Sequence, residues 1–174
     1  MQKKLVLILT IFCILTILAI SLAVVRSPIL GNLVFPYDSS KNPINIDFRF
    51  GVTARNELNT FDGTFTKDLI YDGTIKTRLI LTQQELTQIK TKLLDIGFFD
   101  YPSSFQSQSN VSPRDDYHLK VQIGSVIKEV SWYSDSDLDS KTKADLDQLY
   151  QLLYNMIVQK LEYKLLQPAS GGYC

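Results

Sequence analysis

An uncharged apolar run near the start of the chain limits its possible folds most. The run is the 21-residue segment Leu5–Val25, preceded by Lys3 and Lys4 and followed by Arg26. A helix of that length, rising about 1.5 Å per residue, is roughly 30 Å long, the thickness of the hydrocarbon core of a bilayer. Residues 1–26 are therefore expected to form a transmembrane anchor.

A cleaved signal peptide is the alternative interpretation of the same segment. Its basic start fits, and cleavage near Ala23, after Ser21-Leu22, would give a secreted product. The apolar run is longer than the ~7–15 residues of a signal peptide, which favours an uncleaved anchor. Two lysines precede the run and one arginine follows it. We therefore expect a single-pass protein of the cell membrane with a cytoplasmic N-terminus and its domain outside.

The rest of the chain predicts a linker, one domain and a tail. Residues 27–43 contain three prolines and a glycine, which is typical of an extended linker. Residues 44–168 have the length of a single domain, and the glycine-rich residues 169–174 are expected to be a flexible tail.

Charge and cysteine content narrow the set of partners. Three of the 18 basic residues precede residue 27, so residues 27–174 carry 15 basic and 18 acidic side chains, a net charge of −3. This balance gives no support for a nucleic-acid partner. Cys13 lies in the apolar run and Cys174 ends the chain, so no disulfide within the domain is expected. Cys174 can instead link two chains as a disulfide dimer.

Hydrophobic alternation predicts the strands of the domain. Ile44–Phe50 alternates strictly and indicates a half-buried strand, whereas 51–63 is predicted to be a polar connection. Two strands flank Asp72-Gly73, and a bulged three-residue loop that pairs Ile70 with Thr74 places Asp68 opposite Lys76. A second hairpin turns at Gly124-Ser125 and pairs Ile123 with Val126, Val121 with Lys128, Leu119 with Val130 and Tyr117 with Trp132.

Capping residues and a 3.6-residue periodicity predict two helices. Thr82 and Glu85 form a capping box at the start of the first helix, and Gly97 ends it. The second runs from about Lys141 to Tyr163, with its buried side formed by Leu146, Leu149, Leu153, Met156, Ile157 and Leu161. The order is βββαββα. This predicts an α+β fold in which an antiparallel sheet of about five strands carries two helices on one face.

Several segments resemble a known group of proteins. Arg55–Phe61, Gly63–Asp68, Gly97–Pro102 and Gln167–Tyr173 look like segments of small uncharacterised bacterial proteins, many from Gram-positive bacteria, that are membrane-anchored or secreted. Because these similar proteins have no known activity, the resemblance does not predict one for this chain. The order of elements is also remotely similar to that of emfourin-like inhibitors of thermolysin-type metalloproteases.

The resemblance and the polar composition single out one set of residues as a candidate binding surface. It consists of Arg55, Asn56, Asn59, Thr60, Lys67 and Asp68. These side chains can fix a ligand, or they can equally stabilise their own loop, with Asp68 bonded to Lys76.

Other candidate sites are better explained as structural features. His118 is the only histidine and falls on the solvated face of its strand, so it forms neither a catalytic nor a zinc site. Asp135, Asp137 and Asp139 resemble the start of a calcium loop that lacks its glycine and glutamate, and a capping cluster is favoured. Core packing is expected for Tyr117 and Trp132, although with Phe105 they also fit a carbohydrate or peptide platform. Asn110-Val111-Ser112 is a glycosylation sequon relevant only to a eukaryotic secretory pathway.

These observations favour a non-catalytic module that binds or scaffolds a protein or cell-envelope component outside the membrane. No catalytic, cofactor-binding or metal-binding motif is found, so no cofactor is expected. A metalloprotease inhibitor is one alternative. A secreted enzyme that uses a carboxylate pair, Asp68 with Asp115 or Asp116, is the other.

Overall fold

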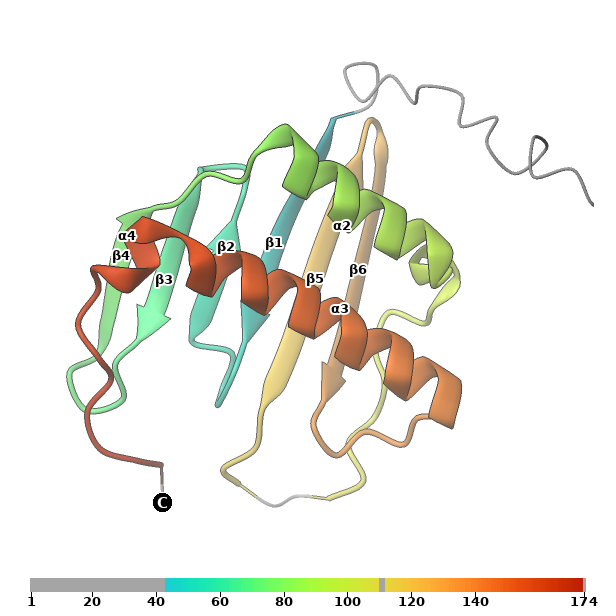
Figure 1. The fold of residues 1–174 in the computed structure, drawn as a ribbon. Coiled ribbons are helices and arrows are strands. Elements are labelled where there is room, and N and C mark those ends of the chain that lie inside the picture. Colours follow the sequence, from blue (N-terminus) through green and yellow to red (C-terminus); the bar gives the residue numbers. More distant parts are fainter. Residues whose placement is uncertain (1–42, 110–111, 174) are drawn as a thin grey trace, which may run out of the picture. The chain divides into compact units, whose positions relative to one another are not determined.

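A computed structural model describes residues 43–109 and 112–173 of the chain. They form a six-stranded antiparallel sheet in the order β4-β3-β2-β1-β5-β6, with helices on one face (Figure 1). The strands are β1 (Ile44–Phe50), β2 (Asn56–Asn59), β3 (Thr64–Asp68), β4 (Thr74–Arg78), β5 (Asp116–Ile123) and β6 (Val126–Tyr133). The helices are α2 (Gln83–Asp95), η3 (Phe98–Asp100), α3 (Ser140–Gln159) and α4 (Leu161–Lys164). The predicted α+β class is confirmed.

The predicted anchor Leu5–Val25, the linker up to residue 42, the Asn110-Val111 part of the sequon and Cys174 lie outside the described residues. Within residues 43–109 and 112–173, no helix has the length and apolar character needed to cross a membrane.

Local sequence signals account for β1, α2 and the β5–β6 hairpin. The alternate residues of β1 are buried, as predicted. Thr82 and Glu85 form the capping box of α2, and Gly97 follows the helix with a left-handed φ of 67°. In the hairpin, Ile123 pairs with Val126 and Tyr117 with Trp132, so the predicted register is confirmed.

The core lies between the sheet and the two longer helices, which both cover the same face (Figure 1). Phe48 of β1, Leu93 of α2 and Leu149 of α3 are all fully buried there. Burying a side chain of this size contributes about 1.5–3 kcal/mol, so this layer provides most of the driving force for folding. Tyr117 and Trp132 stack at 5.2 Å in the same layer, which confirms their predicted core role.

The sheet has six strands rather than five, because β2 forms within the predicted connection 51–63. Leu58 is its only apolar residue, so β2 has no alternation that periodicity can detect. Leu58 is nevertheless completely buried, opposite Phe48 of β1 and Phe65 of β3. Pairing on both sides therefore creates this strand.

The predicted register of the β3–β4 hairpin is wrong by two residues. Asp68, not Ile70, pairs with Thr74, and Lys76 lies opposite Thr66 rather than Asp68. A shift of two residues keeps every side chain on its predicted face, so the burial pattern alone does not distinguish the two registers.

The last predicted helix is broken at Lys160, whose ψ of 140° separates α3 from α4. The five residues predicted to be buried in α3 are buried, but Leu161 in α4 is 66% exposed. The break turns the chain away from the direction of α3, and this explains why the helical periodicity fails at Leu161.

Candidate binding sites

Asp68, at the end of β3, is the centre of the first candidate site. Its side chain is only 5% exposed, and its Oδ1 atom lies 3.4 Å from Arg55 Nη1. The same Oδ1 accepts the Ile70 N–H at 3.0 Å, while Asn56 Oδ1 accepts the Asp68 N–H at 3.0 Å. A buried carboxylate must be paired in this way to remain charged. Three of the six predicted surface residues therefore meet here.

The C-terminal tail completes this site. The Tyr173 hydroxyl donates a hydrogen bond to Asp68 Oδ2, although the two residues are 105 positions apart. Burial, together with this bond, raises the pKa of the tyrosine hydroxyl. The backbone of Ser170 forms a parallel bridge with Ile70, through Ser170 N–H to Leu69 C=O (3.2 Å) and Tyr71 N–H to Ser170 C=O (3.3 Å). Residues of the tail that was predicted to be flexible thus have defined contacts.

The other three predicted residues have separate roles. Lys67 Nζ donates to the Gln167 carbonyl at 2.9 Å and lies 5.0 Å from the centre of the Tyr163 ring. Asn59, at the opposite end of β2 from Asn56, accepts the N–H groups of the two residues that follow Thr60. The Thr60 hydroxyl accepts the Ile46 N–H at 2.7 Å. Asn59 thus stabilises its own loop, and Thr60 joins that loop to β1.

Two loops beside Asp68 contain residues in left-handed conformations. Thr53 (φ 55°) and Ala54 (φ 53°) precede Arg55, and Ile70 (φ 64°) follows Asp68. Positive φ is unfavourable for any residue with a side chain and most unfavourable for a β-branched one. Strain of this kind concentrates at functional sites. Neither this strain nor the role of Tyr173 is predicted from the sequence, in which a tyrosine in a glycine-rich tail is the only signal.

The second candidate site is the open face of the sheet, opposite the helices. Cross-strand pairing aligns polar side chains in two rows that span all six strands. From β4 to β6, the first row is Lys76, Thr66, Glu57, Arg49, His118 and Ser131, and the second is Arg78, Thr64, Asn59, Asp47, Lys120 and Glu129. Positive and negative side chains are interspersed in both rows.

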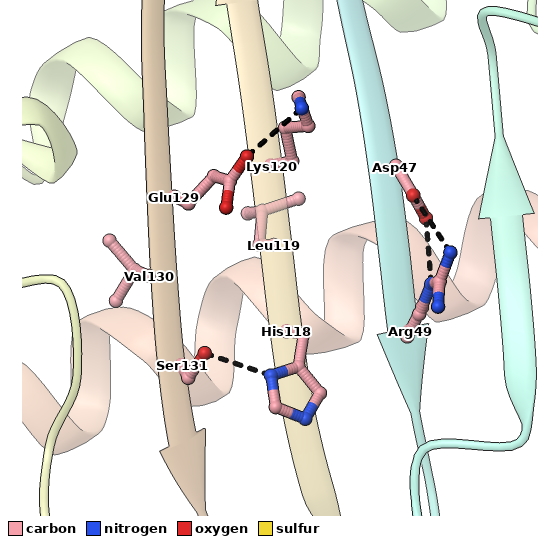
Figure 2. Close-up of a pocket in the computed structure, with 8 residues that line it drawn as sticks. All are labelled: Asp47, Arg49, His118, Leu119, Lys120, Glu129, Val130 and Ser131. Carbon is pink, nitrogen blue, oxygen red and sulfur yellow. Dashed lines mark hydrogen bonds and ion pairs between the residues drawn. The ribbon is translucent and has the colours of Figure 1, made fainter.

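A shallow hollow of about 390 Å³ lies on this face over β1, β5 and β6 (Figure 2). Arg49 contacts Asp47 (3.3 Å) and Glu57 (3.0 Å), and the pairing with Asp47 and then Glu57 raises the pKa of the guanidinium above its ordinary value. Lys120 pairs with Glu129 at 3.0 Å. The charges around the hollow are thus largely balanced by their neighbours.

His118 and Ser131 form the only histidine–serine pair of the described residues. His118 Nδ1 lies 2.8 Å from Ser131 Oγ at the hollow, as Figure 2 shows. In a catalytic triad a carboxylate orients the histidine from its other side. Among residues 43–109 and 112–173, no carboxylate is hydrogen-bonded to His118. The pair resembles a polar cross-strand contact more than a catalytic one.

The acidic residues have separate partners. Asp116 pairs with Arg114 at 3.2 Å, while Asp68 is held by Arg55. Asp139 caps α3 by accepting the N–H groups of Lys141 and Thr142, which confirms its predicted capping role. Within the described parts of the chain, no group of three or more histidine, cysteine or acidic side chains is placed to hold a metal ion.

Comparison with known proteins adds no family to this description. The chain matches no protein-family model and no curated protein.

Proposed function

We propose that the chain is a non-catalytic binding module that presents the open face of its sheet to a protein partner outside the cytoplasm. Leu5–Val25 would anchor the module in the membrane. The single observation that carries the proposal is the asymmetry of the sheet. Both long helices cover one face (Figure 1), and cross-strand pairing aligns two rows of polar side chains on the other.

The charges of the open face favour a protein partner. Arg49, Lys76, Arg78 and Lys120 alternate with Asp47, Glu57 and Glu129. A surface that binds nucleic acid or anionic lipid is predominantly positive. An interface with a protein instead combines complementary patches of positive and negative charge.

The size of the open face predicts a transient interaction. Six strands spaced about 4.8 Å apart and on average about 6 residues long give a surface of roughly 25 by 20 Å, or ~500 Å². A standard interface buries about 800 Å² on each partner, and smaller ones are typical of weak, transient complexes. We therefore expect reversible binding rather than a permanent assembly.

The first test of this function is site-specific photo-crosslinking of the full chain in its own cells. A photoreactive residue replaces Thr66 or Lys120 on the open face, or Gln151 on the exposed side of α3 as a matched control. We expect an adduct of one discrete mass from both open-face positions and none from position 151. The double substitution Lys76→Glu and Arg78→Glu should weaken the adduct, because it reverses two charges that have no ion pair in the described residues. Equal adducts from all three positions, or none from the open face, would contradict the proposed function.

A further inference from the structure

The site around Asp68 already holds a short peptide, the chain's own residues 170–173, which pairs with the turn at Ser170 and bends at Gly171. Three positions of this peptide are recognised in different ways, which distinguishes the site from a surface on which a tail merely rests.

The first position is recognised through its backbone. Ser170 donates its N–H to Leu69 and accepts the Tyr71 N–H, as an added β-strand residue does. The Ser170 hydroxyl also bonds the Asp72 carboxylate. Backbone pairing gives affinity for any extended peptide, so selectivity must come from the positions that follow.

The second position favours glycine. Gly171 has a φ of +84°, which residues with a side chain rarely adopt, and a Cβ atom there would lie 2.1 Å from Cε2 of the exposed Tyr71 ring, which would have to move. Gly172, in contrast, has no atom within 4 Å of the place where its Cβ would lie. A side chain at position 171 would therefore contact the site, whereas a side chain at position 172 would not.

The third position is recognised by its phenol group. The Tyr173 hydroxyl reaches the Asp68 carboxylate, which is 5% exposed and is held in place by Arg55 and the Ile70 N–H. A hydrogen bond to a buried charged group is among the stronger ones in proteins. Phenylalanine at this position would leave Asp68 with one hydrogen bond fewer.

The tail is held mainly by these few contacts. Leu165 is 75% exposed, Pro168 and Ala169 are exposed, and Tyr173 is still 36% exposed. Since little apolar surface is buried, the tail can leave the site at a small cost in free energy. Asp68, Arg55 and the strained Ile70 belong to the sheet and its turns, and they would stay in place.

We propose that this is a peptide-binding site for a segment of a partner protein that has glycine followed two residues later by tyrosine and bends at that glycine. The chain's own tail is the resident competitor, and a partner must displace it. This site lies at the end of β3, where Asp68 pairs with Thr74, beyond the two polar rows of the open face. The proposal does not depend on the function assigned to that face.

The experiment uses the full chain and a fluorescent peptide with the sequence of residues 168–173, followed by fluorescence anisotropy. Gly171→Val should expel the tail and leave the site open, whereas the matched control Gly172→Val should keep it closed. We expect Gly171→Val to bind the peptide at least about tenfold more tightly than the wild type or Gly172→Val, because the competing tail is removed.

The peptide itself provides the second comparison. Replacement of its tyrosine by phenylalanine, or of its first glycine by valine, should weaken binding to Gly171→Val at least about tenfold. The proposal is overturned if Gly171→Val binds no peptide, if it binds all three peptides alike, or if the wild type binds as tightly as Gly171→Val.

A second variant keeps the test decisive if Gly171→Val does not fold. Tyr173→Phe retains the tail but removes its bond to Asp68, so peptide affinity should rise several-fold over the wild type. No rise in affinity would overturn the proposal. Binding to Lys76→Glu/Arg78→Glu should match the wild type, because neither residue contacts the tail.

Discussion

At the scale of single residues, Glu85 connects two separate helices. Its carboxylate accepts the Thr82 N–H at 2.6 Å in the capping box and lies 2.6 Å from Lys160 Nζ at the break between α3 and α4. Burial would raise the pKa of Glu85, but the hydrogen bonds from Lys160 and Thr82 outweigh it and lower the pKa below its ordinary value of 4.5. The charged form is therefore more stable in the folded state.

Glu85→Gln should lower the free energy of unfolding by about 1 kcal/mol at pH 7. The lowered pKa means that Glu85 stabilises the fold fully above pH 4.5, and that this contribution is lost as the pH falls toward the folded-state pKa. The loss in the free energy of unfolding caused by Glu85→Gln should therefore be smaller at acid pH than at pH 7.

Urea unfolding at pH 7 and pH 3.5, followed by the fluorescence of the buried Trp132, measures this deficit. Glu162→Gln, at an exposed carboxylate in α4, serves as the control and should change little at either pH. A deficit for Glu85→Gln that is equal at the two pH values would contradict the assigned role of its charge.

At the scale of elements, the turn between β3 and β4 is the most unusual. It spans five residues, 69–73, and contains both a left-handed glycine, Gly73, and a left-handed isoleucine, Ile70. The backbone bridge from Ile70 to Ser170 gives this turn a partner outside its own hairpin. This bridge joins the strained turn to the tail.

Ile70→Asn should raise the free energy of unfolding by about 0.5–1 kcal/mol, because asparagine tolerates positive φ better than a β-branched residue. Ile80→Asn is the control. Ile80 is 53% exposed and has no positive φ, so its replacement should change stability little. The same urea titration measures both variants, and a loss of stability in Ile70→Asn would show that its side chain, not its backbone, matters there.

At the scale of the whole fold, the helices cover one face of the sheet (Figure 1), and the other face carries two rows of polar side chains. Charges of both signs are interspersed along these two rows, so the rows remain hydrated in the absence of a partner. A surface of this kind suits a module held near its partner, because a tether raises the effective concentration of a weak binder.

The tether is tested by expressing the full chain in a bacterial host. We expect an intact N-terminus, recovery in the membrane fraction, and release of a fragment that begins within residues 27–43 when protease is added outside the cells. A chain without residues 1–26 is the control and should not be recovered with the membrane. A soluble product of the full chain that begins near Val24 would instead indicate a cleaved signal peptide.

The sequence by itself determined the parts of the fold that depend on neighbouring residues. Strict alternation predicted Ile44–Phe50, the capping box predicted the start of α2, and the Gly124-Ser125 turn predicted the register of β5 with β6. Each is encoded within a few residues, where side-chain spacing, caps and tight turns restrict the backbone directly.

Only the tertiary structure decided the features that depend on residues far apart. Strand β2 exists because β1 and β3 pair with it on both sides, and its single apolar residue predicts no strand. The β3–β4 register shifted by two residues without moving any side chain to the other face, so no pattern distinguishes the two registers. Asp68 accepts a hydrogen bond from Tyr173 and is not paired with Lys76, the partner predicted from the sequence. This contact joins residues 105 positions apart, which no local sequence pattern connects.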